Sequence, residues 1–168
     1  MIGSLAAEGP ADAGEAAAEQ PSASTFVTMM VRDQLCGIPV LSVRDIIVTQ
    51  AMTRVPLAPP EIAGSLNLRG RIVTAIDLRR RLNLPSRDNG QAGMSVVVER
   101  QGELYSLVVD SVREVIALDS HRLEPNPPTL AATWREFSAG IYRLQSDLLV
   151  VLNTERLLAI NLEGMPLQ

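Results

Sequence analysis

Short apolar runs rich in β-branched residues recur along the chain, and Gly, Pro, Asn or Asp separates most of them. The runs lie at residues 25–31, 37–40, 71–76, 94–99, 104–109 and 148–152. Runs of this length and composition predict β-strands, and their spacing is typical of barrels or sandwiches rather than of a parallel α/β sheet. We therefore expect an all-β fold.

Two short helices are predicted among these strands. In DLRRRLNLP, Asp77 can cap a helix whose Leu78 and Leu82 share one face, and Pro85 ends it. Asn153 can cap a similar helix in NTERLLAI. The three arginines of the first helix, residues 79–81, are expected to form its solvated face, with a phosphate or nucleic-acid patch as the alternative.

The chain also repeats itself. At an offset of 69 residues, eight of the 28 pairs from 32/101 to 59/128 are identical, including most of SVRDII (42–47) against SVREVI (111–116). The offset then becomes 76, which aligns RIVTAIDLRRRL (71–82) with DLLVVLNTERLL (147–158) and the cap Asp77 with the cap Asn153. The pattern predicts a duplicated unit of roughly 70 residues, with halves at about 32–82 and 101–158. Similarity between unrelated short β segments is the alternative.

A barrel of about 70 residues has a marginal core on its own. Two copies can stabilise each other across a shared apolar interface, because apolar burial contributes roughly 25 cal/mol per Å². Two barrels joined in this way leave a groove between them in which an elongated partner could dock.

Composition excludes several classes of protein. The single Cys36 cannot form an intrachain disulfide, and with one Cys and one His the chain cannot build a zinc cluster of such ligands. A sequence pI near 5.0 and an aromatic content of 3% argue against a nucleic-acid partner. The apolar runs are too short for a membrane helix, so we expect no insertion into a membrane.

Charge and composition set apart the start of the chain. Residues 1–20 hold four acidic side chains and no basic one, whereas the remainder holds 15 of each sign. The Ala-, Gly-, Glu-, Pro- and Ser-rich stretch 1–24 is expected to be a disordered acidic tail, and 25–168 to be the folded part, as one domain or two very small ones. Because no signal peptide is evident, a cytoplasmic location is expected.

No constellation for catalysis stands out. His121 has no nucleophile nearby in the sequence, Cys36 lies in an apolar strand, and the helix-cap role accounts for Asp77. No phosphate-binding loop is present, because the chain has no lysine and no G-x-G-x-x-G motif. A pair of carboxylates facing each other across a cleft stays open as an enzymatic alternative. We expect a protein that is not an enzyme and has no cofactor and no metal.

Arg69 differs from the other arginines. It lies in GSLNLRG (64–70), at a glycine-flanked turn before a buried strand. An arginine on such a turn can present its planar fork to a carboxylate or a carbonyl group. The sequence therefore indicates a contact residue, with a structural brace as the alternative.

The run GSLNLRGRIVTAIDLRRRL (64–82) resembles the hallmark segment of the CheW family of bacterial chemotaxis coupling proteins, in which G-x-x-N-L-R-G precedes an apolar strand and a D-L-R helix start. Upstream, CGIPVLSVRDII (36–47) resembles the family's aromatic-Gly-I segment and V-x-E-I turn. The resemblance runs from about residue 26 to 158. Thr74 stands where proline is usual, Cys36 where an aromatic residue is usual, and Asp45 where glutamate is common.

The resemblance implies two pseudo-duplicated five-stranded SH3-like β-barrels that share an apolar core, with short helices. It also implies a non-enzymatic adaptor that joins the cytoplasmic tips of methyl-accepting chemoreceptors to the regulatory domain of the histidine kinase CheA. Other CheW-like domains would be further partners in the rings of a receptor array. An accessory coupling protein for surface motility or second-messenger control is the alternative.

Carried over position by position, the resemblance implies two sets of contact residues. The candidates for the receptor groove are Val40, Val43, Asp45, Gly64 and Arg69. The candidates for the kinase contact are Thr53, Arg54 and Leu57. Arg69 is expected to pair with an acidic or carbonyl group of the receptor tip.

Overall fold

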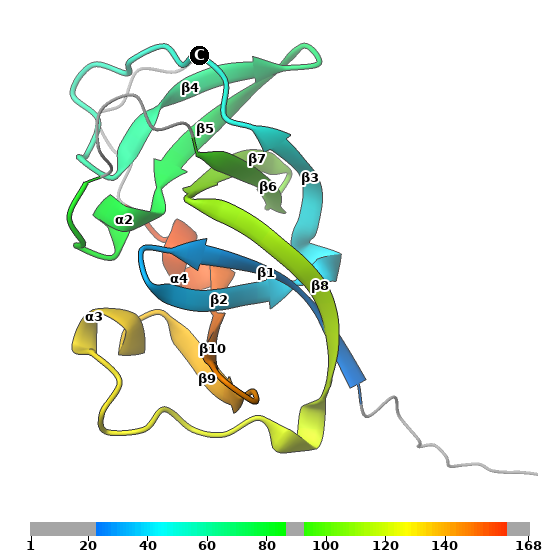
Figure 1. Cartoon of the computed structure of the whole chain (residues 1–168). Coiled ribbons are helices and arrows are strands. Elements are labelled where there is room, and N and C mark those ends of the chain that lie inside the picture. Colours follow the sequence, from blue (N-terminus) through cyan, green and yellow to red (C-terminus); the bar gives the residue numbers. More distant parts are fainter. Residues whose placement is uncertain (1–22, 87–92, 161–168) are drawn as a thin grey trace, which may run out of the picture.

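The expected all-β fold is confirmed by the computed structural model, which describes residues 23–86 and 93–160 (Figure 1). The strands are β1 (Ala23–Val31), β2 (Gln34–Pro39), β3 (Val43–Val48), β4 (Ile62–Leu68), β5 (Arg71–Asp77), β6 (Met94–Arg100), β7 (Glu103–Val109), β8 (Ser111–Asp119), β9 (Ser138–Arg143) and β10 (Leu148–Leu152). The short helices are η1 (Val40–Ser42), α2 (Leu78–Arg81), η2 (Ser120–Arg122), α3 (Ala132–Arg135) and α4 (Thr154–Leu158).

The expected acidic tail lies almost entirely outside the described residues. Strand β1 begins at Ala23, so the last two residues of the stretch 1–24 pair with β8 instead of belonging to a tail. None of the helices in the described part of the chain is long and apolar enough to span a membrane.

The strands form two five-stranded sheets. Sheet I has the order β3-β6-β7-β5-β4, and sheet II has the order β8-β1-β2-β10-β9. The two orders are the same when β1 to β5 are matched with β6 to β10. Each sheet thus combines three strands from one repeat half with a hairpin from the other.

This exchange of hairpins differs from a model in which each repeat half folds as its own barrel. The hairpin β6–β7 lies between β3 and β5 of sheet I, antiparallel to β3 and parallel to β5. The hairpin β1–β2 occupies the matching place between β8 and β10 in sheet II. Neither half can complete its sheet without the other, which accounts for how two units with marginal cores form one stable body.

The shared apolar core predicted from the repeat is present. Val27, Met29 and Ile38 of sheet II belong to the same buried cluster as Val96 and Leu107 of sheet I, and all five are at most 1% exposed. We call this boundary between the two sheets the seam. Because apolar burial is the main favourable term in folding, the seam is expected to contribute much of the stability.

Both predicted helix caps are confirmed. Asp77 Oδ1 accepts a hydrogen bond of 3.0 Å from the Arg79 amide at the start of α2. Asn153 Oδ1 accepts one of 3.2 Å from the Arg156 amide at the start of α4. The buried anchors Leu82, directly after α2, and Leu158, the last residue of α4, lie at matching places of the repeat.

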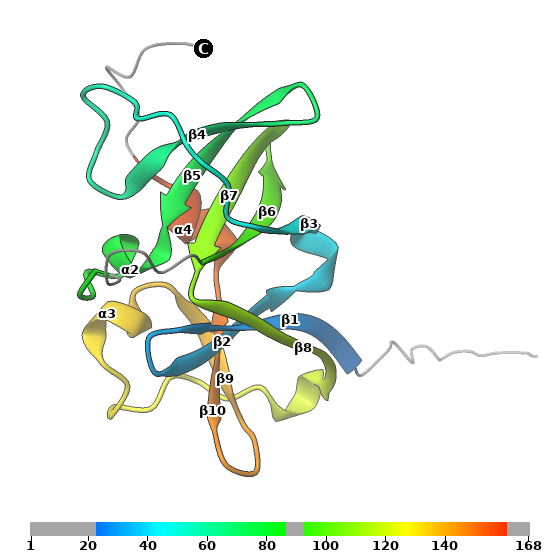
Figure 2. The ribbon, with the colours of Figure 1, turned by 45° about the horizontal axis from the view of Figure 1, so that its top comes forward.

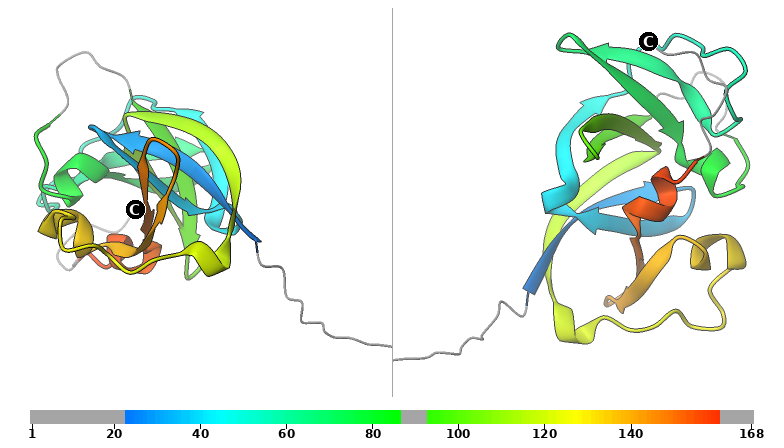
Figure 3. Two further views of the ribbon diagram at one scale, coloured as in Figure 1. Left: turned by 60° about the horizontal axis from the view of Figure 1, so that its bottom comes forward. Right: turned by 180° about the vertical axis from the view of Figure 1, so that it is seen from behind.

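The expectation that the arginines of α2 form a solvated face was wrong for two of the three. The side chains of Arg79 and Arg81 are only 15% exposed, whereas that of Arg80 is 49% exposed. The reason is that α2 lies at the seam, where it meets both sheets instead of one (Figures 1 and 3).

Candidate functional site

Arg69 and Asp45 come together at the edges of sheet I. Arg69 occupies the turn between β4 and β5, and its Nη1 lies 2.8 Å from Oδ2 of Asp45 on β3. Strands β3 and β4 are the first and last of the sheet. Sheet I is therefore curled so far that its two edges approach each other, which brings two of the predicted receptor residues into contact.

The local backbone holds the Arg69 side chain outward. Arg69 and Gly70 have φ values of +51° and +84°, and the Gly70 amide donates a 2.9 Å hydrogen bond to Asn67 Oδ1. The tight turn leaves the Arg69 side chain 76% exposed. Because an arginine fork has several donors, most of this guanidinium stays accessible to a partner while it contacts Asp45.

Asp45 is more enclosed than Arg69. Its side chain is 22% exposed, and its Oδ1 accepts a 2.9 Å hydrogen bond from the Ile46 amide. The buried Oδ2 has the guanidinium of Arg69 as its charged neighbour, in an ion pair rather than a well-aligned hydrogen bond. The carboxylate thus holds the positive charge of Arg69 at the edge of the sheet.

Val40 on η1 and Val43 at the start of β3 are half-buried and pack against the shared core. The exposed apolar side chains around them are ones that the sequence reasoning did not select. Leu41 on η1 is 87% exposed, and Ile46 and Val48 on β3 are 37% and 63% exposed. The alternating burial along β3 could have identified the latter two, because residues two apart face the same side of a strand. We call Arg69, Asp45, Leu41, Ile46 and Val48 the β3 surface.

Gly64 has a different setting. It is buried, and a Cβ added there would lie 2.7 Å from the carbonyl oxygen of Thr53. Thr53 and Ser65 form a two-way backbone bridge, with both hydrogen bonds 2.8 Å long. Because Gly64 has no side chain, the backbone at Thr53 can lie close to the edge of β4. A predicted receptor residue, Gly64, thus adjoins a predicted kinase residue, Thr53.

The remaining kinase candidates line a hollow. Arg54 and Leu57 surround it together with three prolines of the same loop and Arg80 of α2, and its volume is about 410 Å³. Leu57 is 91% exposed and has a φ of +62°, a backbone conformation that costs a residue with a side chain roughly 1–2 kcal/mol. An exposed leucine held in this conformation is the strongest sign of a contact site in this loop, because such strain is often found at functional positions. We call this region the Leu57 surface.

The two surfaces lie at opposite ends of β4. The Leu57 surface adjoins Ile62 at its start, and the turn of Arg69 follows Leu68 at its end (Figure 2). A strand rises about 3.3 Å per residue, so seven residues separate the two surfaces by roughly 20 Å. Two partners can therefore occupy one sheet without sharing contacts.

The residues weighed for catalysis have structural roles. Asp77 caps α2, His121 is 82% exposed beside Asp119, and Cys36 is fully buried with its thiol pKa raised by desolvation. Among the described residues, no group of three or more His, Cys, Asp or Glu side chains is arranged to hold a metal ion.

Comparisons of the sequence and of the structure identify proteins similar to this chain. The model of the CheW-like domain family matches residues 25–161. The chemotaxis protein CheW of Helicobacter pylori is 26% identical over 148 residues, covering 88% of this chain and 89% of that protein. The chemotaxis protein CheW of Bacillus subtilis is 32% identical over 110 residues, covering 66% of this chain and 70% of that protein.

A solved structure has the same fold. The scaffolding protein TtCheW from Thermoanaerobacter tengcongensis superimposes with a TM-score of 0.75 at 27% identity, covering 85% of this chain and 99% of that one. The family is one of non-catalytic scaffold proteins, as the names of these relatives reflect. With the family model matching most of its length, the chain is a member of the CheW-like domain family.

Proposed function

We propose that this protein is a chemotaxis adaptor that couples the cytoplasmic tips of chemoreceptors to the histidine kinase CheA. The observation that carries the proposal is the placement of two distinct contact surfaces at opposite ends of β4 in one sheet. An adaptor must bind two partners at once, and this arrangement gives each its own surface. Membership of the CheW-like family supports the chemotaxis scaffold role.

The β3 surface is the proposed receptor site. Receptor tips are helical, and a helix in a groove gains affinity from a few anchors, among which arginine is enriched. Arg69 supplies an exposed charge, and Leu41 of η1 with Ile46 and Val48 of β3 supply exposed apolar side chains on the segment that also carries Asp45. Asp45 positions Arg69 through their ion pair. The half-buried Val40 and Val43 pack against the shared core and so anchor the segment that carries this surface.

The Leu57 surface is the proposed kinase site. Leu57 projects an apolar side chain into solvent, and Arg54 adds a charge on the rim of the adjoining hollow. An exposed leucine seated in a pocket of the regulatory domain of CheA would bury most of its apolar area, worth roughly 1.5–3 kcal/mol. Thr53 and Gly64 act by fixing the path of this segment against β4.

The proposal also covers location and assembly. An adaptor of receptor tips works in the cytoplasm, recruited to membrane-associated receptor arrays. Other CheW-like domains are further partners in those arrays. No step of this role needs a cofactor or a metal.

Calorimetric titration with the purified regulatory domain of CheA from the same genome tests the proposal. Saturable binding at micromolar concentrations or tighter is expected for the wild-type protein. A folded protein that bound the receptor tip but not this kinase would instead be an accessory coupling protein for another pathway. A protein that bound neither would contradict the adaptor role.

A further inference from the structure

We propose that α2 is a positioning element that fixes the orientation of the two sheets and thereby the shape of the β3 surface. Arg79 and Arg81 are the positioning residues. The inference rests on the proposed function for its consequence in receptor binding, but its structural part stands on the contacts described below.

The chain crosses from one sheet to the other at two described places. Residues 40–42 of η1 lead from β2 in sheet II to β3 in sheet I, and Asp110 leads from β7 in sheet I to β8 in sheet II. Figures 1 and 3 show α2 and α4 on one side of the seam and the cyan turn of η1 on the other. One side of the seam therefore carries two helices, and the other carries the chain crossing at η1.

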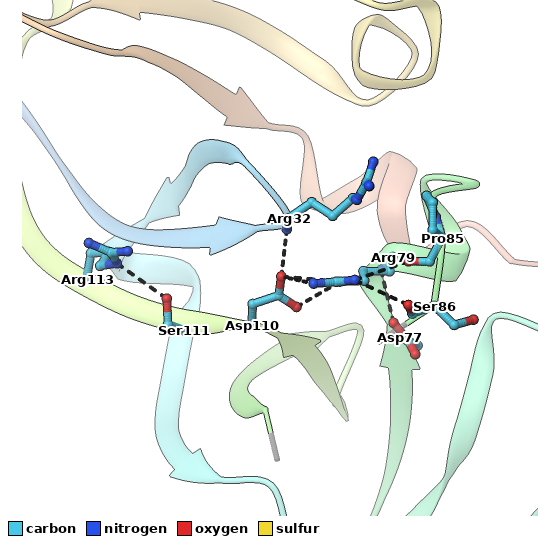
Figure 4. A network of polar contacts seen from close by, with 8 residues as sticks. All are labelled: Arg32, Asp77, Arg79, Pro85, Ser86, Asp110, Ser111 and Arg113. Atoms are coloured by element: carbon cyan, nitrogen blue, oxygen red, sulfur yellow. Dashed lines mark hydrogen bonds and ion pairs between the residues drawn. The ribbon is translucent and has the colours of Figure 1, made fainter. Parts of the chain in front are cut away.

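Arg79 secures the crossing at Asp110. Its Nε lies 3.0 Å and 3.2 Å from the two carboxylate oxygens of Asp110, and its Nη2 lies 2.6 Å from Oδ2 (Figure 4). The same Oδ2 accepts a 2.7 Å hydrogen bond from the Arg32 amide in the β1–β2 turn. A helix on sheet I is thus joined through one carboxylate to a hairpin of sheet II.

Arg81 reaches α4, the helix that follows strand β10 of sheet II. Its guanidinium donates hydrogen bonds of 2.9 Å to the carbonyl groups of Arg156 and Leu157 in α4, and it lies 4.7 Å from the ring centroid of Phe137. The carbonyl end of a helix carries a partial negative charge, which favours a cation there. Arg81 therefore holds the last turn of α4 against α2.

The rest of α2 shows why these two arginines act together. Leu78 and Leu82 are fully buried in the shared core. Among the residues that the structure describes, Arg80 points outward and contacts Asp77 at 3.8 Å and the Pro60 carbonyl at 3.3 Å, both near its own sheet. Of these three successive arginines, Arg79 and Arg81 are mostly buried and make contacts across the seam, whereas Arg80 is half exposed.

The apolar core and the two arginines contribute differently to how the two sheets are held. Burial of apolar surface holds the sheets together but has no preferred direction. Paired guanidinium–carboxylate hydrogen bonds are directional and fix an orientation. On the η1 side, Leu41 is 87% exposed, and Arg44 contacts its carbonyl group at 3.3 Å. The orientation of the sheets is therefore set on the α2 side, and the η1 side, which carries part of the β3 surface, follows it.

The structural part is tested by measuring the distance between spin labels on the two sheets. Val48 on β3 and Val115 on β8 are 63% and 55% exposed, so V48C/V115C carries one label on each sheet. The native Cys36 is fully buried and its thiol pKa is raised, which keeps it unlabelled. The distance distribution is recorded by pulsed electron paramagnetic resonance in the wild-type, R79Q, R81Q, R79Q/R81Q and R80Q backgrounds.

We expect a single narrow distribution for the wild type and for R80Q, the matched control from the same helix. R79Q and R81Q should each broaden or shift the distribution, and the double variant should do so most. If R79Q/R81Q does not fold, as judged by circular dichroism, R79K and R81K replace it, because lysine keeps the charge but not the planar fork. An unchanged distribution in the folded variants would overturn the proposal.

The functional part is tested with unlabelled protein and a purified receptor-tip fragment. R79Q/R81Q should bind the fragment about tenfold more weakly than wild type, while the affinity of R79Q/R81Q for the regulatory domain of CheA stays within about twofold. R80Q is the control for receptor binding alone, because Arg80 lines the hollow of the Leu57 surface, and its affinity for the receptor fragment should stay within about twofold of wild type. Altered distances with unchanged receptor affinity would overturn the link between orientation and binding. Absence of receptor binding by the wild type itself would instead contradict the proposed function, and the distance measurements would still decide the structural part.

Discussion

The ion pair between Arg69 and Asp45 joins the two edges of sheet I, with Nη1 and Oδ2 2.8 Å apart. The matching positions in sheet II are Gln145 and Glu114, so the second sheet has no pair of this kind there. Its edges instead face each other across a hollow of about 560 Å³ that residues of β8 and of the β9–β10 hairpin line. The duplicated fold therefore has an ion pair between the edges of one sheet, and Gln145 with Glu114 at the equivalent positions of the other.

Replacing Arg69 by alanine should weaken binding of the receptor tip by about 1–3 kcal/mol, because it removes a charged anchor from an exposed turn. Stability should change by less than about 1 kcal/mol, since the side chain is 76% exposed and such ion pairs contribute little. Titration calorimetry and urea unfolding measure the two quantities. Unchanged receptor affinity in R69A would contradict the role of this residue.

Replacing Leu57 by asparagine should weaken binding of the regulatory domain of CheA by about 1–3 kcal/mol through loss of the apolar side chain. The fold should be unharmed or slightly more stable, because asparagine tolerates a φ of +62° better than leucine does. The combination of weaker binding with undiminished stability separates a contact residue from a structural one. A variant that bound the kinase normally would remove Leu57 from the kinase site.

Gly64 and its counterpart Gly140 should both be intolerant of a side chain. A Cβ at Gly64 would lie 2.7 Å from Thr53 O, and one at Gly140 would lie 2.9 Å from Glu124 O. Both carbonyls belong to backbone bridges, so neither can move freely. G64A and G140A should each lower the free energy of unfolding by about 1–3 kcal/mol. G70A is the control, because a Cβ at Gly70 would meet no atom within 4 Å. It separates the cost of a steric clash from the cost of replacing a glycine in a turn.

Stability should decline at alkaline pH. Burial raises the pKa of Tyr105 and of Tyr142 above the ordinary value of 10.0, and it raises the pKa of the Cys36 thiol above 9.0. The unfolded chain therefore loses these protons first, so their contribution is complete below the ordinary values and is lost as pH rises through the folded-state values. Urea unfolding between pH 8 and pH 11 should show a falling free energy above about pH 9. The variant Y142F should show a shallower fall, and an identical curve would contradict the assignment for Tyr142.

Local signals in the sequence predicted the parts of the fold that depend on neighbouring residues. Asp77 and Asn153 act as helix caps as expected, because capping needs only an acceptor side chain and the amides that follow it. The strand at residues 148–152 was also predicted with its observed bounds. The motif around Arg69 identified an exposed turn, because the glycines at 64 and 70 are visible in the sequence and the structure has Arg69 and Gly70 at positive φ.

Features that depend on distant contacts were not predicted. The exchange of hairpins between the repeat halves leaves no local pattern, since each hairpin would look the same in its own half. Strands β3, β4, β8 and β9 were missing from the expected set, and all four lie at the edges of the sheets. The burial of Arg79 and Arg81 follows from partners far away in sequence, such as Asp110.

An adaptor of this kind must bind two partners at once through separate surfaces. The most direct measurement is titration of the receptor-tip fragment into this protein, first alone and then with its kinase site saturated by the regulatory domain of CheA. Receptor affinities should agree within about threefold in the two titrations, with R69A impaired only toward the receptor and L57N only toward the kinase. Mutual exclusion of the two partners, or loss of both interactions in either variant, would contradict the adaptor role.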